Sequence, residues 1–515
     1  MTEPTPGAAT TASTAPAGAA APTNSSRPPR LGEVPSFVEY MGKGWDVPDR
    51  TPPVVAGVAE AAAAHRALLA AEFPGKTLVV GAGRAPVRAN DTYYDFRPDS
   101  AFAWLTGCTS AEDAVVVLRG ESAVLYLPAP AYPGDKGFFT DNAHGELWVG
   151  AAPGLAEWSA ALGIEVRPLS ALNDDISPNG SSLAGSLPTG SPLSGAAPDP
   201  ALSVALSRLR MIKDEWETAQ LRAAVNHTVD GFAATARELP AAIAGGGERW
   251  LQGTFDRHAR TVGNGPGYSS IVGSGKHAPT LHWVRCDGPV HGGDLVLLDM
   301  GVEVNSLYTA DVTRTLPASG EFSATQRQVH DLVEKAHRAG LAAVAPGRRF
   351  SDFHHACMEV IARGLADWGL LPVSVDEALS PSGQEHRRYL VCGVGHHLGL
   401  DVHDCTRVPR EEYQDGSLAP GMVLTVEPGL YFHAHDLTVP PELRGIGVRI
   451  EDDLLVTASG AEVLSDALPI TASGLENWMR EQNLPVAGGD AQQLRLPPPR
   501  GRRATLRPRR PTAAS

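Results

Sequence analysis

Between residues 295 and 315 the chain reads Leu-Val-Leu-Leu-Asp-Met-Gly-Val-Glu-Val-Asn-Ser-Leu-Tyr-Thr-Ala-Asp-Val-Thr-Arg-Thr, with Asp299 at the end of an apolar run. The segment between Asp299 and Asp311 is typical of a hairpin. Side chains alternate between the two faces of a strand, so Leu295, Leu297 and Asp299 share one face. We therefore expect the hairpin to bring the two carboxylates to one place.

Three further acid or imidazole side chains lie in similar segments later in the chain. His396 falls in Gly-Val-Gly-His-His-Leu-Gly-Leu-Asp-Val-His-Asp, and Glu427 closes Met-Val-Leu-Thr-Val-Glu before Pro-Gly. Glu451 closes Gly-Val-Arg-Ile-Glu, where Arg449 and Asp453 share its face. Four carboxylates and one imidazole can converge only if cations offset their mutual repulsion.

The joint pattern predicts a metal site, although each residue taken alone is better explained as a surface or salt-bridged group. An oxygen-rich ligand set with one imidazole suits hard or borderline ions such as Mn²⁺, Co²⁺ or Zn²⁺, with Mn²⁺ favoured. The number of carboxylates indicates two ions, roughly 3.5–4 Å apart, that share an activated water. The expected ligands are Asp299, Asp311, His396, Glu427 and Glu451.

With these residues in place, the chain resembles the pita-bread metallopeptidases, and among them most closely the Xaa-Pro aminopeptidase (aminopeptidase P) family. Two more motifs carry the resemblance. Lys-Asp-Glu at 213–215 looks like the start of the catalytic domain, and Ile-Val-Gly-Ser-Gly at 271–275, followed by Leu-His-Trp at 281–283, looks like the substrate-binding strand. The fold implied is an α/β N-terminal domain followed by an α+β pita-bread catalytic domain of the creatinase/aminopeptidase type.

The resemblance also implies roles for individual residues. Glu427 would act as general base as well as ligand. His282 and His403 would be active-site histidines that do not bind metal: His282 would stabilise the oxyanion or shuttle a proton, and His403 would contact the scissile carbonyl. Arg449 would contact substrate, although it is as well explained by neutralising the carboxylates. Trp148 from a neighbouring subunit would close a slot for proline. Without the resemblance, the two histidines would be interpreted as buried, hydrogen-bonded groups.

Two features depart from the family pattern. The spacing between Asp299 and Asp311 is one residue longer than usual, which a hairpin loop can absorb. Cys392 stands where such peptidases often carry a histidine, four residues before His396, and is most simply a small buried filler. Neither change removes a ligand.

The expected activity is removal of the N-terminal residue from peptides with proline second. A prolidase, which accepts only Xaa-Pro dipeptides, would use the same ligands, and motif residues separate the two poorly. Methionine aminopeptidases do not normally carry such a large preceding domain. A non-catalytic pita-bread binding protein or a creatinase-like amidinohydrolase would lack the complete ligand set.

Composition agrees with a cytoplasmic enzyme. The five cysteines form no Cys-x-x-Cys pair, which argues against a disulfide framework or a thiolate zinc site. The N-terminus has no secretory pattern, and no apolar run is long enough to cross a bilayer. A formal net charge of −15 disfavours nucleic acid or an anionic membrane as partner. We expect peptide substrates and a homodimer or homotetramer.

The 515 residues divide by composition into four segments. Residues 1–30 are rich in Ala, Thr, Pro and Ser and should be disordered. Residues 31–200 predict an α/β domain, with a flexible insert or linker at 176–199. Residues 201–485 carry the motifs and form the catalytic domain. The Arg- and Pro-rich tail at 486–515 should be disordered.

Overall fold

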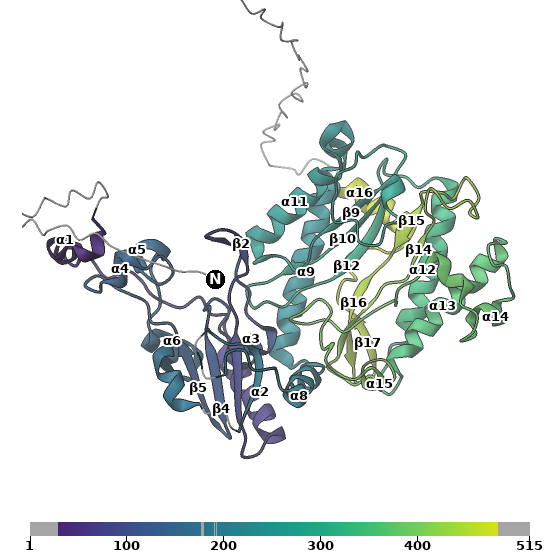
Figure 1. Ribbon diagram of the computed structural model, residues 1–515. Coiled ribbons are helices and arrows are strands. Elements are labelled where there is room, and N and C mark those ends of the chain that lie inside the picture. The colour runs from purple at the N-terminus through teal and green to yellow at the C-terminus, as the bar shows by residue number, and fades with distance from the viewer. Residues whose placement is uncertain (1–28, 177–179, 190, 192, 483–515) are drawn as a thin grey trace, which may run out of the picture.

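The computed structural model describes residues 29–176, 180–189, 191 and 193–482, which form two bodies packed against each other (Figure 1). Nearly all of the two terminal extensions predicted to be disordered, 1–30 and 486–515, lies outside the described residues. None of the described helices combines the length and apolar character that crossing a bilayer requires.

The N-terminal body is built on a five-stranded mixed sheet of order β6-β5-β4-β1-β7. Alternate residues of its central strands enter two separate cores: Leu78 and Val80 pack in one, and Val79 packs in the other. The sheet is therefore covered on both faces. Its strands are β1 (Thr77–Ala82), β4 (Val115–Arg119), β5 (Ser122–Leu127), β6 (Glu165–Pro168) and β7 (Ser181–Ser186), and its main helices are α2 (Val58–Glu72), α3 (Ser100–Thr106) and α6 (Leu155–Leu162).

One expectation for this body was wrong. Within 176–199, predicted to be a flexible insert or linker, residues 181–186 form β7, which pairs in parallel with β1. The strand reads Ser-Ser-Leu-Ala-Gly-Ser and has no alternating apolar pattern of its own, because its place is set by the neighbouring strand. Helix α8 (Pro200–Arg210) then packs on α2 and β7, although the predicted boundary at residue 201 would assign it to the second domain.

Two small units project from the N-terminal body. A short hairpin is formed by β2 (Val87–Ala89) and β3 (Thr92–Tyr93). Helices α1 (Pro35–Met41), α4 (Gly137–Thr140) and α5 (Glu146–Val149) lie together on the side away from the second body (Figure 1).

In the second body, strands lie between two groups of helices, with α9 and α11 on one side and α12 and α13 on the other (Figure 1). Capping boxes start two long helices, with Asp214 and Glu217 beginning α9 and Ser323 and Gln326 beginning α12. The helices are α9 (Glu215–Arg237), α10 (Leu239–Ala241), α11 (Gly247–Val262), α12 (Ala324–Ala343), α13 (Phe350–Asp367), α14 (Val375–Leu379), α15 (Arg410–Tyr413) and α16 (Ala472–Gln482).

The strands of this body are short, and all except β17 are largely buried. β9 and β12 flank β10 in one antiparallel sheet, β16 lies between β13 and β17 in a second, and β14 pairs with β15. Met300 faces Val312 in the β10–β12 register, which confirms the predicted hairpin. The bounds are β8 (Gly265–Pro266), β9 (Ile271–Ser274), β10 (Leu295–Met300), β11 (Val302–Glu303), β12 (Val312–Pro317), β13 (Val423–Val426), β14 (Gly429–Tyr431), β15 (Gly447–Arg449), β16 (Asp452–Thr457) and β17 (Gly460–Val463).

Candidate active site

The hairpin places Asp299 and Asp311 side by side. The hydroxyl oxygen of Tyr268 lies 2.6 Å from Oδ1 of each aspartate. A phenol has one proton to donate, so it can satisfy only one of two ionised carboxylates. Both acids are buried, and a further positive charge is needed if both are ionised.

His396 reaches this pair from the other half of the domain. Its backbone is held to β13, since Thr425 N donates to His396 O over 2.9 Å and His396 N donates to Thr425 Oγ1 over 3.1 Å. Its Nδ1 lies 3.1 Å from the carbonyl oxygen of His397, which can only accept, so Nδ1 carries the proton. The lone pair of the neutral imidazole is then on Nε2, 3.3 Å from Asp311 Oδ2 and 3.6 Å from Glu427 Oε1.

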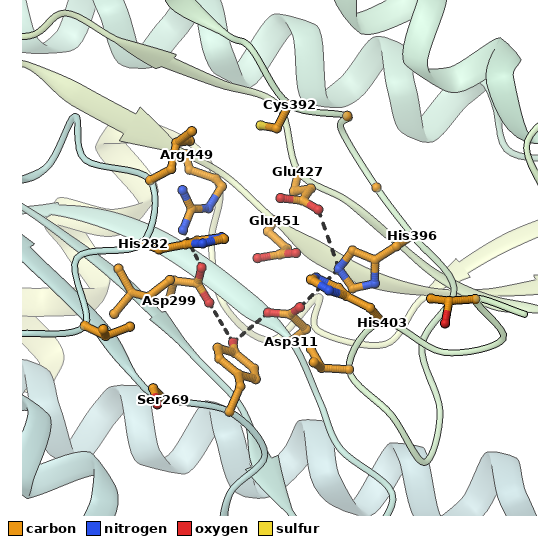
Figure 2. A pocket seen from close by; sticks show the side chains of 18 of the residues that line it. Ser269, His282, Asp299, Asp311, Cys392, His396, His403, Glu427, Arg449 and Glu451 are labelled. Carbon is orange, nitrogen blue, oxygen red and sulfur yellow. Dashed lines mark hydrogen bonds and ion pairs between the residues drawn. The ribbon is translucent and has the colours of Figure 1, made fainter. Parts of the chain in front are cut away.

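Glu427 and Glu451 complete the group of acids (Figure 2). Glu427 follows β13, and its N–H donates to Val394 O over 3.0 Å. Glu451 lies between β15 and β16, and its Oε2 accepts from Thr313 Oγ1 at 2.6 Å. Ligand-type atoms of Asp311, His396 and Glu451 all lie within 4.8 Å of one another.

Arg449 is buried against the acids. Its Nη2 donates to Asp299 Oδ2, its Nε donates to Thr313 Oγ1 over 3.0 Å, and its Nη1 donates to the Tyr431 hydroxyl over 2.9 Å. The guanidinium neutralises one carboxylate of the group and also reaches the cavity wall.

The electrostatics show how strongly the site favours added positive charge. Burial raises the pKa of Glu427 to about 7, and burial together with Asp311 raises the pKa of Glu451 well above its usual range. Burial, only partly offset by Arg449, also raises the pKa of Asp299. For His396, burial favours the neutral form, but Asp311 and Glu427 outweigh it and raise the pKa to about 9. Protons therefore compete for a site whose donor set suits a cation.

A cavity of about 1010 Å³ opens onto these acids. His282 and His403 both line it, and the His403 ring centroid lies 4.3 Å from that of His396. Burial and the neighbouring His396 lower the pKa of His403, which favours a neutral ring. Cys392 also lines the cavity. Apolar and aromatic side chains form another part of the wall: Ile271, Leu281, Val284, Val402, Val408 and Tyr413. Ser269, Thr406, Arg410 and Gln414 add polar groups to it.

Trp148 lies elsewhere. It belongs to α5, is 61% exposed and donates from Nε1 to Phe139 O over 2.9 Å. It is not among the residues that line the cavity within this chain.

Sequence reasoning missed Tyr268, Thr313 and Tyr431, which hold the acids and Arg449. Their polar groups act through contacts with residues far along the chain, and no motif marks them. Gly267, next to Tyr268, was the one available signal, since a Cβ there would lie 1.9 Å from Thr309 Oγ1.

Comparisons with known proteins identify the family. The family model for metallopeptidase family M24 matches residues 219–458, and that for the aminopeptidase P N-terminal domain matches residues 62–182. Xaa-Pro aminopeptidase 2 of Streptomyces coelicolor is 47% identical over 451 residues, which cover 85% of this chain and 95% of that protein. This chain belongs to the M24 metallopeptidases.

Solved structures of M24 aminopeptidases agree with the fold. Aminopeptidase P from E. coli with the inhibitor Pro-Leu has a TM-score of 0.71 and 28% identity, and covers 82% of this chain and 98% of its own. Aminopeptidase PepP from Pseudomonas aeruginosa has a TM-score of 0.68 and 29% identity, and covers 84% and 99%. The predicted architecture, an α/β domain before a pita-bread domain, is confirmed.

Proposed function

We propose that this chain is a dinuclear-metal aminopeptidase that removes the N-terminal residue from peptides with proline in second position. The observation that carries the proposal is the convergence of all five predicted ligands at one cavity, in a chain that matches Xaa-Pro aminopeptidases over nearly their whole length. The match to the aminopeptidase P N-terminal domain disfavours the prolidase alternative.

The residues fit the metal ions that this family implies. The raised pKa values of Glu427 and Glu451 and the single proton on Tyr268 all indicate a group of acids that lacks a compensating charge. Oxygen-rich donors with one imidazole suit Mn²⁺, with Co²⁺ or Zn²⁺ as other candidates. We propose as ligands Asp299, Asp311, His396, Glu427 and Glu451.

When bound, two divalent ions would lower the pKa of a shared water from about 15.7 toward roughly 7 and so supply hydroxide. Glu427 would take the proton of the attacking water and pass it toward the leaving nitrogen. His282 would stabilise the tetrahedral oxyanion or move a proton, and His403 would contact the scissile carbonyl. Arg449 favours the ionised form of Asp299, and its reach to the cavity wall supports a contact with substrate.

The substrate preference follows from the bond before proline. This bond is a tertiary amide without N–H, so recognition must come from shape. The apolar side of the cavity supports a slot for the pyrrolidine ring, and the acidic side supports binding of a free α-amine.

The assembly and location remain predictions. Leu147, Trp148 and Val149 on α5 are 45%, 61% and 50% exposed, an apolar surface that supports contact with another subunit in a dimer or a dimer of dimers. We propose that Trp148 closes the proline slot of a neighbouring subunit. Trp148→Ala should then relax the proline preference without loss of metal, and a fully active monomer would refute this contact. A cytoplasmic location remains an expectation from composition.

The activity is tested with metal-free protein reloaded with Mn²⁺ or Co²⁺. Xaa-Pro-Yaa tripeptides should be cleaved after the first residue, N-acetylated tripeptides should be refused, and metal analysis should approach two ions per chain. Cleavage of Xaa-Pro dipeptides alone would establish a prolidase instead. Full activity in protein verified to be free of metal would refute the mechanism.

A further inference from the structure

We propose that Glu248 is a positioning residue for His282, acting through the indole of Trp283. This inference rests on the proposed function, because it assigns His282 a task in peptide cleavage. Glu248 lies in the first turn of α11, and its side chain is completely buried. A buried carboxylate is retained without large cost only where hydrogen-bond donors surround it.

Glu248 has four such donors, two on each oxygen. Oε1 accepts from Ser274 N and from His277 Nδ1, each at 2.8 Å. Oε2 accepts from Trp283 Nε1 at 2.8 Å and from Gly288 N at 2.7 Å. Hydrogen bonds to an ionised acceptor are stronger than those between neutral groups.

All four donors lie within residues 274–288, which run from the last residue of β9 into the connection to β10 and include His282. Gly288 lies seven residues before β10 begins at Leu295, so one carboxylate holds the first and larger part of this connection together. The Glu248 N–H adds a bond of 3.0 Å to Gly288 O. At Gly288 a Cβ would lie 2.5 Å from the His277 ring, so the loop closes tightly onto the acid.

His282 depends on this loop because its own side chain has no hydrogen-bond partner among the described residues. The imidazole projects into the cavity (Figure 2) from a backbone whose next residue is Trp283. The Trp283 indole is fixed by Glu248, by the His277 ring stacked 4.0 Å away, and by the Arg285 guanidinium 4.2 Å from its ring centroid. The acid therefore sets the direction of His282 without touching the cavity.

The test begins with Glu248→Gln, which keeps the size of the side chain. One acceptor oxygen becomes an amide donor, so two of the four N–H groups lose their partner. On a Xaa-Pro-Yaa tripeptide, kcat should fall at least tenfold while KM changes less than threefold and the metal content stays the same.

A double-mutant cycle separates positioning from a general structural role. In a His282→Ala background, Glu248→Gln should cost less than a further twofold, because the group that it orients is gone. Glu217 provides a matched control: it is 2% exposed, accepts from Trp104 Nε1, and lies at the junction of the two bodies. Glu217→Gln should change kcat by the same factor in both backgrounds. An equal loss from Glu248→Gln in both backgrounds would overturn the proposal.

A second variant tests the same role by kcat, and hydrogen exchange tests it without any need for activity. Trp283→Phe removes a single donor and should also lower kcat, by a smaller factor than Glu248→Gln does. In Glu248→Gln, hydrogen exchange of the amides in 275–287 should accelerate at least tenfold, while β10 is unchanged. A wild type that cleaves no Xaa-Pro peptide would refute the proposed function. A wild type that does cleave, with a variant that matches it in kcat and exchange, would refute the positioning role alone.

Discussion

The two histidines that line the cavity, His282 and His403, are held by different kinds of structure. His282 lies on a loop tied to Glu248 within the second body. His403 is followed by Asp404, which accepts from Lys213 Nζ at 3.2 Å and from Arg210, both near the junction of the two bodies. The wall that carries His282 is therefore held within the second domain. The wall that carries His403 depends on how the two domains pack against each other.

The N-terminal body reaches the His403 wall directly. Ser100 Oγ donates to Asp401 Oδ1 over 2.6 Å, and Arg97 donates to Leu400 O. Arg210 Nη2 also donates to Asp401 Oδ2 over 2.8 Å. The N-terminal domain therefore contacts the segment that carries His403, whereas Glu248 and its four donors all belong to the second domain.

The largest expected effect does not depend on either wall of the cavity. Glu427→Gln removes a ligand charge and the proposed base together, so kcat should fall by about 10³-fold or more while the fold is retained. Steady-state kinetics with circular dichroism would measure this. If the fall in kcat depended on whether either wall had also been altered, Glu427 would not act at the centre that the two walls share.

A stability measurement should separate the walls. Asp404→Asn leaves Lys213 and Arg210 buried without a full counter-charge and should destabilise the protein by about 3–5 kcal/mol. Glu248→Gln leaves neutral donors unpaired and should cost about 1–3 kcal/mol. Urea unfolding at fixed metal and pH would give both values. A larger destabilisation from Glu248→Gln than from Asp404→Asn would contradict the distinction between a wall held by charges and a wall held by hydrogen bonds.

The junction should also respond to pH through His65 of α2. Burial favours its neutral form, but Asp214 at 3.0 Å and Glu217 at 3.6 Å outweigh burial and raise the pKa to about 9. The folded state therefore favours the protonated ring, and this stabilisation is complete below about pH 6.5 and lost as pH rises through about 9. The change should be up to about 3 kcal/mol.

Urea unfolding of wild type and His65→Gln between pH 6 and 10 would test this linkage. The difference in free energy of unfolding between wild type and His65→Gln should become smaller as pH rises. Relative to the intrinsic exchange rate at each pH, the protection of amides in 399–405 should fall over the same range, whereas the protection in 275–287 should not. A difference in free energy of unfolding that does not change with pH would contradict the raised pKa of His65.

The smallest effect is expected at Cys392. Burial and Glu427 raise the pKa of its thiol, so the group is neutral at physiological pH and adds no charge to the cavity. Cys392→Ala should change kcat less than twofold in the tripeptide assay. A loss of tenfold or more would mean that the cysteine performs a task that family members assign to histidine.

The sequence indicates where the acids lie, because Asp299, Glu427 and Glu451 each end an apolar run and a hairpin joins Asp311 to Asp299. It does not predict their supports. Glu248 looks like an ordinary acid in the first turn of a polar helix, and its four donors come from 26 to 40 residues away. β7 is missed for a similar reason, since its conformation is imposed by β1 and not by its own residues.

The origin of the acids along the chain has a consequence for folding order. Asp299 and Asp311 are brought together by a hairpin, a contact of short sequence separation that forms early. Glu427 and Glu451 join only when the last third of the chain closes over them, which is slow because the loop to be closed is long. A nascent chain therefore presents two carboxylates before it has a complete site. A cation that prefers the complete set of ligands would slow the unfolding of the finished domain. Metal supply would thus govern the lifetime of the native state as well as its chemistry.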